Sequence, residues 1–281
     1  MSQSLPRWRH AGYGSTLVGI LIVIVFLFPV FWMVSTSLKS PAAIFATPPA
    51  LIPTPLVLDA YRDAVAGDPA VVRAIGTSLV ISVGTMLLTL ALAAPAAYGL
   101  ARLRLPGGAL VLLLLLITQL LPSIVIAGPL FVLFTRLHLV SSYQALILAD
   151  TTLTLPFAVI VLRPFFLSVP RDLEAAALVD GATRWGSFFR ITLPLVRAGL
   201  VTVAAFSFLF AWGEFVFALS LTTSEDFQPV TVALNRLIGQ YGTQWSSLMA
   251  ISTTVALPII AIFAGLQRFI VGGLTTGATR E

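Results

Sequence analysis

Long apolar stretches separated by short charged segments make up most of the sequence. Four of them contain no charged residue, at 11–38, 74–101, 105–135 and 237–267. Two more contain a single acid each, Asp150 within 143–162 and Glu214 within 198–223. Each stretch reaches the roughly 20 residues that an α-helix needs to cross a hydrocarbon core of about 30 Å. The pattern therefore predicts an all-α membrane protein with one domain over residues 1–281 and six transmembrane helices, at approximately 14–36, 74–101, 108–135, 143–163, 198–222 and 246–270.

The composition agrees with this pattern and excludes several kinds of chemistry. Hydrophobic residues make up 58% of the chain and charged residues 10%, whereas soluble domains contain about 25% charged residues. The sequence contains no cysteine, and its two histidines, His10 and His138, are far apart, so thiol chemistry is excluded and a histidine metal site is not expected. Lys39 is the only lysine, and no glycine-rich phosphate loop surrounds it. We therefore expect this chain to bind no cofactor or metal and to have no enzyme activity of its own.

The positive charges predict the orientation of the helices. The first apolar run, 17–33, is longer than the core of about 7–15 residues in a cleaved signal peptide, so we expect it to remain as a membrane anchor. With six spans the two termini share one side of the membrane. That side receives Arg7, Arg9, Arg102, Arg104, Arg163, Arg171, Arg184, Arg190, Arg197, Arg268 and Arg280, and the other receives Lys39, Arg62, Arg73, Arg136 and Arg236. The positive-inside rule then predicts a multi-pass protein of the cell inner membrane with both termini in the cytoplasm.

Two segments between the spans are long enough to carry structure of their own. Residues 39–72 form a predicted external loop in which five prolines disfavour a long helix, and 59–63 is expected to be a short surface helix. Residues 163–197 form the longest predicted cytoplasmic segment. A partner protein is expected to bind there.

Within that cytoplasmic segment, 168–194 has the pattern of a helix, a turn and a second helix. Ser168 is a suitable N-cap for the first helix. Gly181 can take the left-handed conformation that ends a helix, and Thr183 can cap the next one. Alanines at 175–177 give the first helix little side-chain bulk, so it can enter a cleft in another protein.

This segment resembles the signature of the membrane subunits of ABC importers. The signature is Glu-Ala-Ala, three residues, any residue, Gly, nine residues, Ile, any residue and Leu-Pro. Every fixed position is filled at that spacing, by Glu174, Ala175, Ala176, Gly181, Ile191, Leu193 and Pro194, with Asp180 directly before the glycine. The order of six spans and the ending at 271–278 also resemble the maltose-type permease subunits of carbohydrate importers.

The resemblance implies a type I ABC importer permease fold in which 168–194 is a cytoplasmic coupling segment between spans four and five. It implies a heterodimer with a second permease subunit, two ATP-binding cassette subunits that hold ATP and magnesium, and an external solute-binding protein. These partners assemble at the lipid bilayer, and no nucleic acid is involved. The helix from Glu174 to Gly181 would lie in a groove of an ATPase subunit and move with it during alternating access. The C-terminal tail would make a second ATPase contact through Gly277 and Arg280, although Glu281 departs from the common ending.

Residues inside the spans are candidates for the translocation path, namely Glu214, Asp150, Trp212 and Gln119. An ionisable group in a span faces a cavity, water or a partner, and a carboxylate beside an indole suits a sugar, whose ring packs on the aromatic face while its hydroxyls donate to the acid. Trp212 and Glu214 are about 200° apart on a helix, so they face one cavity only if the helix breaks at Gly213. The alternatives are that the acids pair with neighbouring helices or lie at the interface, and that Gln119 bonds to another helix.

The sequence is therefore interpreted as a permease subunit that forms half of the pathway of a carbohydrate or polyol importer. Importers of glycerol phosphate or polyamines are alternatives. A membrane-embedded enzyme that uses Asp150 and Glu214 for acid–base chemistry is a different class, but neither span contains a histidine and no span carries two acids. A structural protein would explain the spans but not the signature.

Overall fold

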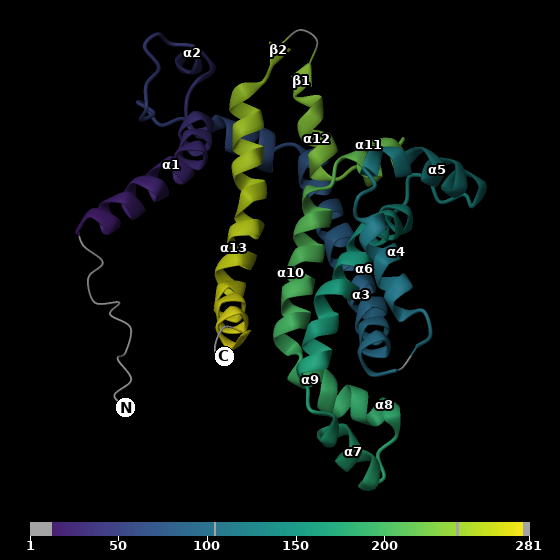
Figure 1. Cartoon of the computed structure of the whole chain (residues 1–281). Coiled ribbons are helices and arrows are strands. Elements are labelled where there is room, and N and C mark those ends of the chain that lie inside the picture. Colours follow the sequence, from purple (N-terminus) through teal and green to yellow (C-terminus); the bar gives the residue numbers. More distant parts are fainter. Residues whose placement is uncertain (1–12, 104, 240–241, 278–281) are drawn as a thin grey trace. The chain divides into compact units, whose positions relative to one another are not determined.

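Figure 1 shows the computed structural model of the chain, which describes residues 13–103, 105–239 and 242–277, with side chains in 14–103, 105–239 and 242–265. Most of these residues are helical. Internal contacts divide the chain into two units, Met1–Asp68 with Leu237–Thr254 and Pro69–Arg236 with Val255–Glu281. The last helix, α13 (Trp245–Gly277), contributes to both units.

The first unit contains the long helix α1 and a loop that folds back onto its end. Its elements are α1 (Tyr13–Ser37), α2 (Pro41–Ile44), the π-helix η1 (Tyr61–Ala66) and an antiparallel hairpin of β1 (Ile238–Gly239) and β2 (Gly242–Thr243). The Val57 N–H donates to the Leu38 carbonyl at 3.0 Å, and the Ser35 hydroxyl donates to the Leu51 carbonyl at 2.6 Å. Residues 39–68 form only short helices, as their prolines predict, and η1 overlaps the short helix expected at 59–63.

Three long helices form the core of the second unit: α3 (Pro69–Arg102), α6 (Tyr143–Ser168) and α10 (Arg197–Gly213) (Figure 1). The helices α3 and α6 run in the same direction, as two contacts between them show. Ile147 of α6 lies against Gly84 of α3, and further along both helices the Arg163 side chain donates to the Leu100 carbonyl. Buried alanines on α3 pack in this core and allow the helices to approach closely. They are Ala93, Ala94, Ala97 and Ala101.

Shorter elements complete the second unit. They are α4 (Gly108–Thr118), α5 (Ser123–Arg136), α7 (Arg171–Val179), α8 (Arg184–Ser187), the π-helix η2 (Phe188–Thr192), α9 (Leu193–Leu195), α11 (Val216–Leu221), the 3-10 helix η3 (Glu225–Phe227) and α12 (Val230–Arg236). An ion pair between Arg73 and Asp226 joins η3 to α3, and another between Arg236 and Glu225 (2.8 Å) joins it to α12.

Among the described residues, four helices are long and apolar enough to cross a membrane, and the number becomes six if each of two bent pairs is one span. The predicted third span is divided between α4 and α5, whose axes differ by 98°. Pro122 precedes α5 in an extended conformation and has no N–H for a continuous helix. In the predicted fifth span, α10 is bent by 78° against the helical segment before it, and it ends at Gly213 because Glu214 is extended, at φ −67° and ψ 132°.

Candidate functional site

The helix–turn–helix of the signature segment is formed by α7 and α8. Gly181 has a φ of +85°, its N–H donates to the Leu178 carbonyl at 3.2 Å, and the N–H of the next residue donates to the Ala177 carbonyl at 2.9 Å. These two bonds form a Schellman motif, which ends a helix at a left-handed glycine. The Thr183 hydroxyl caps α8 by accepting from the Gly186 N–H at 3.0 Å. The predicted roles of Gly181 and Thr183 in this turn are therefore confirmed.

The beginning of α7 differs from the expectation. Ser168 is the last residue of α6, and its hydroxyl donates back to the Phe165 carbonyl at 2.8 Å. The N-cap position of α7 belongs to Pro170, which has no side-chain acceptor. The prediction that Ser168 caps α7 was wrong, because α6 continues to this serine and its hydroxyl is used within α6.

Glu174 binds residues of its own chain. Its Oε1 accepts from the Arg102 Nε at 2.9 Å and from the Thr192 hydroxyl at 3.1 Å, and its Oε2 accepts from the Tyr98 hydroxyl at 3.1 Å. The side chains of Arg102 and Glu174 are 7% and 15% exposed, so water screens the ion pair only weakly. The Arg102 Nη2 also donates to the Val169 carbonyl at 2.7 Å. The end of α3 is thereby fastened to the start of α7 and to η2.

Several small and apolar residues of α7 are exposed. Ala175 and Ala176 are exposed, while Leu173, Leu178 and Val179 are 44%, 46% and 87% exposed. Figure 1 shows α7 and α8 beyond the ends of α6 and α10. This arrangement leaves a short apolar helix available to another protein.

The second half of the signature follows the turn and leads into α10. Ile191 lies in η2 and Leu193 begins α9, and both are partly buried, with Leu193 packed against the core of the unit. Pro194 lies in the first turn of α9, where a missing N–H costs nothing. The chain then bends by 78° into α10. Ile191, Leu193 and Pro194 therefore hold and redirect the chain, and Asp180 is the C-cap residue of α7.

Glu214 lies at the break between α10 and α11 and acts as a cap. Its two carboxylate oxygens accept from the N–H groups of Phe217 at 2.9 Å and Ala218 at 3.0 Å. The Thr231 hydroxyl donates to its backbone carbonyl at 2.8 Å. Its negative charge also complements the positive end of α11. The break at Gly213 that the sequence allowed is present, and Glu214 stabilises it.

Asp150 is 2% exposed, and no described residue makes a hydrogen bond with its Oδ1. Its neighbour Ala149 packs in one cluster with Phe217 and Ala218, the two residues whose N–H groups bind Glu214. The hydroxyls of Thr89 and Thr154 lie 2.7 Å apart. Because α3 and α6 run in parallel, Thr85 and Asp150, each four residues earlier, lie at one level, and Thr85 Oγ1 is also without a partner among the described residues. The structure therefore brings two predicted path residues, Asp150 and Glu214, near one another.

The other two path candidates are engaged in packing. Trp212 is 2% exposed, its Nε1 donates to the Val255 carbonyl at 3.2 Å, and its ring stacks on Phe208. This conformation therefore does not provide the aromatic face that was predicted beside Glu214, because helix packing covers the indole. The Gln119 Nε2 donates to the Leu153 carbonyl at 3.0 Å and joins the end of α4 to α6. This contact matches the alternative in which Gln119 hydrogen-bonds to another helix and does not line the path.

Sequence reasoning missed the partners of Glu174. From the sequence, Arg102 was interpreted only as a charge that sets orientation, and Tyr98 was assigned no role. An arginine and a tyrosine four residues apart share one face of a helix, which was the available signal. For the predicted tail contact, Gly277 is the last residue of α13, and Arg280 lies outside the described residues.

Comparison with known proteins assigns the family. Residues 90–275 match the family described as the inner membrane component of binding-protein-dependent transport systems. The chain is 36% identical to the trehalose transport system permease protein SugB of Mycobacterium tuberculosis, over 97% of this chain and 98% of that one. It is 33% identical to the trehalose/maltose transport system permease protein MalG of Thermococcus litoralis, over 93% and 94%.

A solved structure gives the same assignment for the fold. A chain of a bacterial ABC transporter involved in the import of the acidic polysaccharide alginate superposes with a TM-score of 0.79 at 19% identity, over 95% of this chain and 99% of that one. The predicted ABC importer permease fold is confirmed. The relatives are transport permeases and not enzymes. The chain thus belongs to the family of inner membrane permease components of binding-protein-dependent ABC transport systems.

Proposed function

We propose that the chain is one of two permease subunits of an ATP-driven carbohydrate importer and that α7 is its contact with an ATPase subunit. The exposed apolar side of α7 carries this proposal. Leu173, Leu178 and Val179 are exposed on a helix that is held to the unit through Glu174. Exposed apolar groups beside alanines suit a helix that enters a groove in a partner.

The anchored side of α7 explains how movement of an ATPase reaches the membrane helices. When the ATPases close on ATP, the groove carries α7 with it. Glu174 then pulls on Arg102 at the end of α3 and on Thr192 in η2, which leads through α9 into α10. Two of the three core helices therefore receive the displacement directly. Alternating access follows when these helices change the side on which the pathway is open.

The proposed assembly contains a second permease subunit, two ATPase subunits and an external solute-binding protein. ATP and magnesium bind to the ATPase subunits, and this chain binds no cofactor. The α7 end and both termini face the cytoplasm, which the excess of arginine on that side supports. A bilayer is the remaining partner, since four to six described helices can cross it.

The carbohydrate class rests on the names of relatives. They include permeases for trehalose, diacetylchitobiose and arabinooligosaccharides at 30–36% identity, which cover 97–100% of this chain. Glycerol phosphate and polyamines are the competing solutes, and both carry charge that a sugar lacks. Uptake by the assembled transporter in proteoliposomes tests the class. We expect uptake of at least one neutral sugar, whereas uptake restricted to glycerol phosphate or a polyamine would refute it.

A crosslinking experiment tests the contact at α7, because the natural chain contains no cysteine. Val179→Cys, at a site that is 87% exposed, should crosslink to an ATPase subunit that carries a cysteine along its groove. Leu120→Cys, at a site that is 80% exposed after α4, is the matched control and should not crosslink. Equal crosslinking at both positions, or none at Val179 in an active complex, would contradict the proposal.

A further inference from the structure

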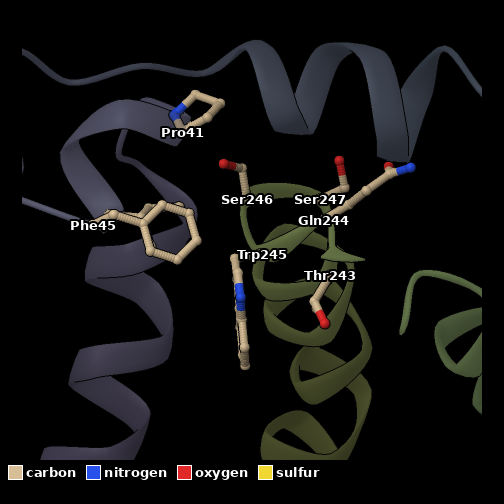
Figure 2. A pocket seen from close by; sticks show the side chains of 8 residues that line it. Pro41, Phe45, Thr243, Gln244, Trp245, Ser246 and Ser247 are labelled. Atoms are coloured by element: carbon tan, nitrogen blue, oxygen red, sulfur yellow. The ribbon is translucent and has the colours of Figure 1, made fainter. Parts of the chain in front are cut away.

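A second candidate site lies in the first unit, between the end of α2 and the first turn of α13. It is a pocket of about 280 Å³, which is near the lower limit of the roughly 300–1,000 Å³ of small-molecule sites. The aromatic rings of Phe45 and Trp245 line it together with the hydroxyl or amide side chains of Thr243, Gln244, Ser246 and Ser247. Figure 2 shows Phe45 extending toward the start of α13, where the Trp245 indole lies beside it and is directed away from Pro41, while the Ser246 hydroxyl is directed toward Pro41.

Both aromatic rings of the pocket are exposed. Phe45 is 71% exposed and Trp245 is 40% exposed, although large aromatic side chains contribute most when they are buried. Short elements precede both residues: α2, which Ser40 caps, ends at Ile44 before Phe45, and the strand β2 ends at Thr243, two residues before Trp245 begins α13. The rings therefore remain available to a ligand that enters the pocket.

Among the described residues, no charged side chain lines this pocket. Lys39, one residue before Ser40, is 4% exposed, and its Nζ lies 4.3 Å from the Trp32 ring centre, so its charge is engaged elsewhere. A phosphate or a polyamine would find no opposite charge among the lining side chains. Hydroxyl and amide side chains both donate and accept hydrogen bonds. A neutral ligand rich in hydroxyl groups satisfies such a set.

We propose that this pocket binds one ring of a neutral saccharide. The C–H face of a pyranose packs against Phe45 and Trp245, and the hydroxyls at its edge bond to Gln244 and Ser246. The volume accommodates one ring better than an oligosaccharide. The inference rests on the proposed function, under which the segments after α1 and before α13 are both external. A sugar that arrives from outside would meet this pocket on its way to the translocation path.

The experiment tests whether sugar binding at the pocket needs the aromatic rings or only apolar side chains. The assembled transporter in proteoliposomes is supplied with its solute-binding protein and with trehalose, maltose or diacetylchitobiose, and the sugar with the highest uptake is chosen. Phe45→Leu and Trp245→Leu keep an apolar side chain but remove the ring, whereas Phe45→Tyr and Trp245→Phe keep a ring. Leu56→Ala, at a site that is 67% exposed in the same loop, is the control outside the pocket.

We expect each leucine variant to raise the half-saturating concentration of sugar-loaded binding protein about three- to tenfold, as loss of one aromatic contact implies. The ring-preserving variants and the control should remain near the wild type. ATPase activity without binding protein should be unchanged in all variants. Saturation-transfer NMR of the detergent-solubilised complex with the chosen sugar, without binding protein, should show a signal that Trp245→Leu removes.

Three results would overturn the proposal. One is leucine variants that transport like the wild type. Another is a wild-type complex that transports the sugar but gives no saturation transfer to it, or gives a transfer signal that Trp245→Leu leaves unchanged. The third is loss of affinity for sugar-free binding protein in the leucine variants, which would identify the pocket as a docking surface or interfacial anchor. Each of these three results would refute the pocket proposal alone. If the wild type transports none of the three sugars but takes up a charged solute, the proposed function and the pocket proposal both fail.

Discussion

Arg102 at the end of α3 and Glu174 in the first turn of α7 form an ion pair with an Nε–Oε1 distance of 2.9 Å, although 72 residues separate them. The glutamate is the first fixed residue of the importer signature. Its carboxylate is occupied by the chain's own arginine, threonine and tyrosine. In this conformation it positions α7, and the exposed residues of the same helix remain for the partner.

Breaking this pair should uncouple ATP hydrolysis from transport. Arg102→Met leaves the Glu174 carboxylate with two neutral donors, and the loss of a hydrogen bond to a charged group costs about 1.5–3 kcal/mol. We expect reduced solute uptake per ATP hydrolysed, while the ATPase subunits still co-purify. Asp172→Asn, at an exposed acid in the same helical turn, is the control. A normal ratio of uptake to hydrolysis in Arg102→Met would show that this pair does not transmit movement.

Gly181→Val should lower transport without preventing membrane insertion. A β-branched residue at a φ of +85° is strained by about 1–3 kcal/mol, although a Cβ there would meet no described atom within 4 Å. Gly107, with a φ of +83° and equal free space before α4, offers a matched control, because Gly107→Val carries the same backbone strain away from α7. Uptake should fall much further in the Gly181 variant. Similar uptake by both variants would count against a special role of the α7 turn.

Substitutions at Glu214 separate its capping role from a role in the translocation path. Glu214→Ala removes both acceptors at the start of α11, which should cost about 0.5–2 kcal/mol of stability. Glu214→Gln keeps one acceptor and removes the charge. If the carboxylate lines the path, both variants should change the apparent affinity or the maximal rate of uptake at matched assembly. Unchanged values in both would leave Glu214 with the cap alone.

The purified chain alone should not hydrolyse ATP. The sequence contains one lysine and no glycine-rich loop that could hold phosphates. Phosphate release by the isolated subunit should equal that of empty detergent micelles or vesicles. Release above that background that survives removal of contaminating ATPases would refute the proposed division of labour between the subunits.

The sequence predicted the helices well where hydrophobicity alone decides. Helix α6 contains the expected span at 143–163, and Gly181 and Thr183 take their predicted places because caps depend on neighbouring residues. Pro122 is a local signal for a break between α4 and α5, but the 98° angle between them depends on tertiary packing that no local pattern carries. The burial of Trp212 also depends on tertiary packing, here the contact with Phe208 and α13. Two partners of Glu174, Arg102 and Tyr98, lie 72 and 76 residues away, and the third, Thr192, lies 18 residues away.

The alanine contacts of α3 determine which positions of the sequence are free to vary. Ala93 and Ala97 are fully buried against the neighbouring core, so a larger side chain at either would separate α3 from α6 and break the Thr89–Thr154 contact. Along α1 the reverse holds, since Phe26 is 77% exposed and Ile24 is 61% exposed within its unit. Mutational scanning should therefore find that α1 tolerates almost any exchange of one apolar residue for another, whereas the buried alanines of α3 accept only glycine or serine.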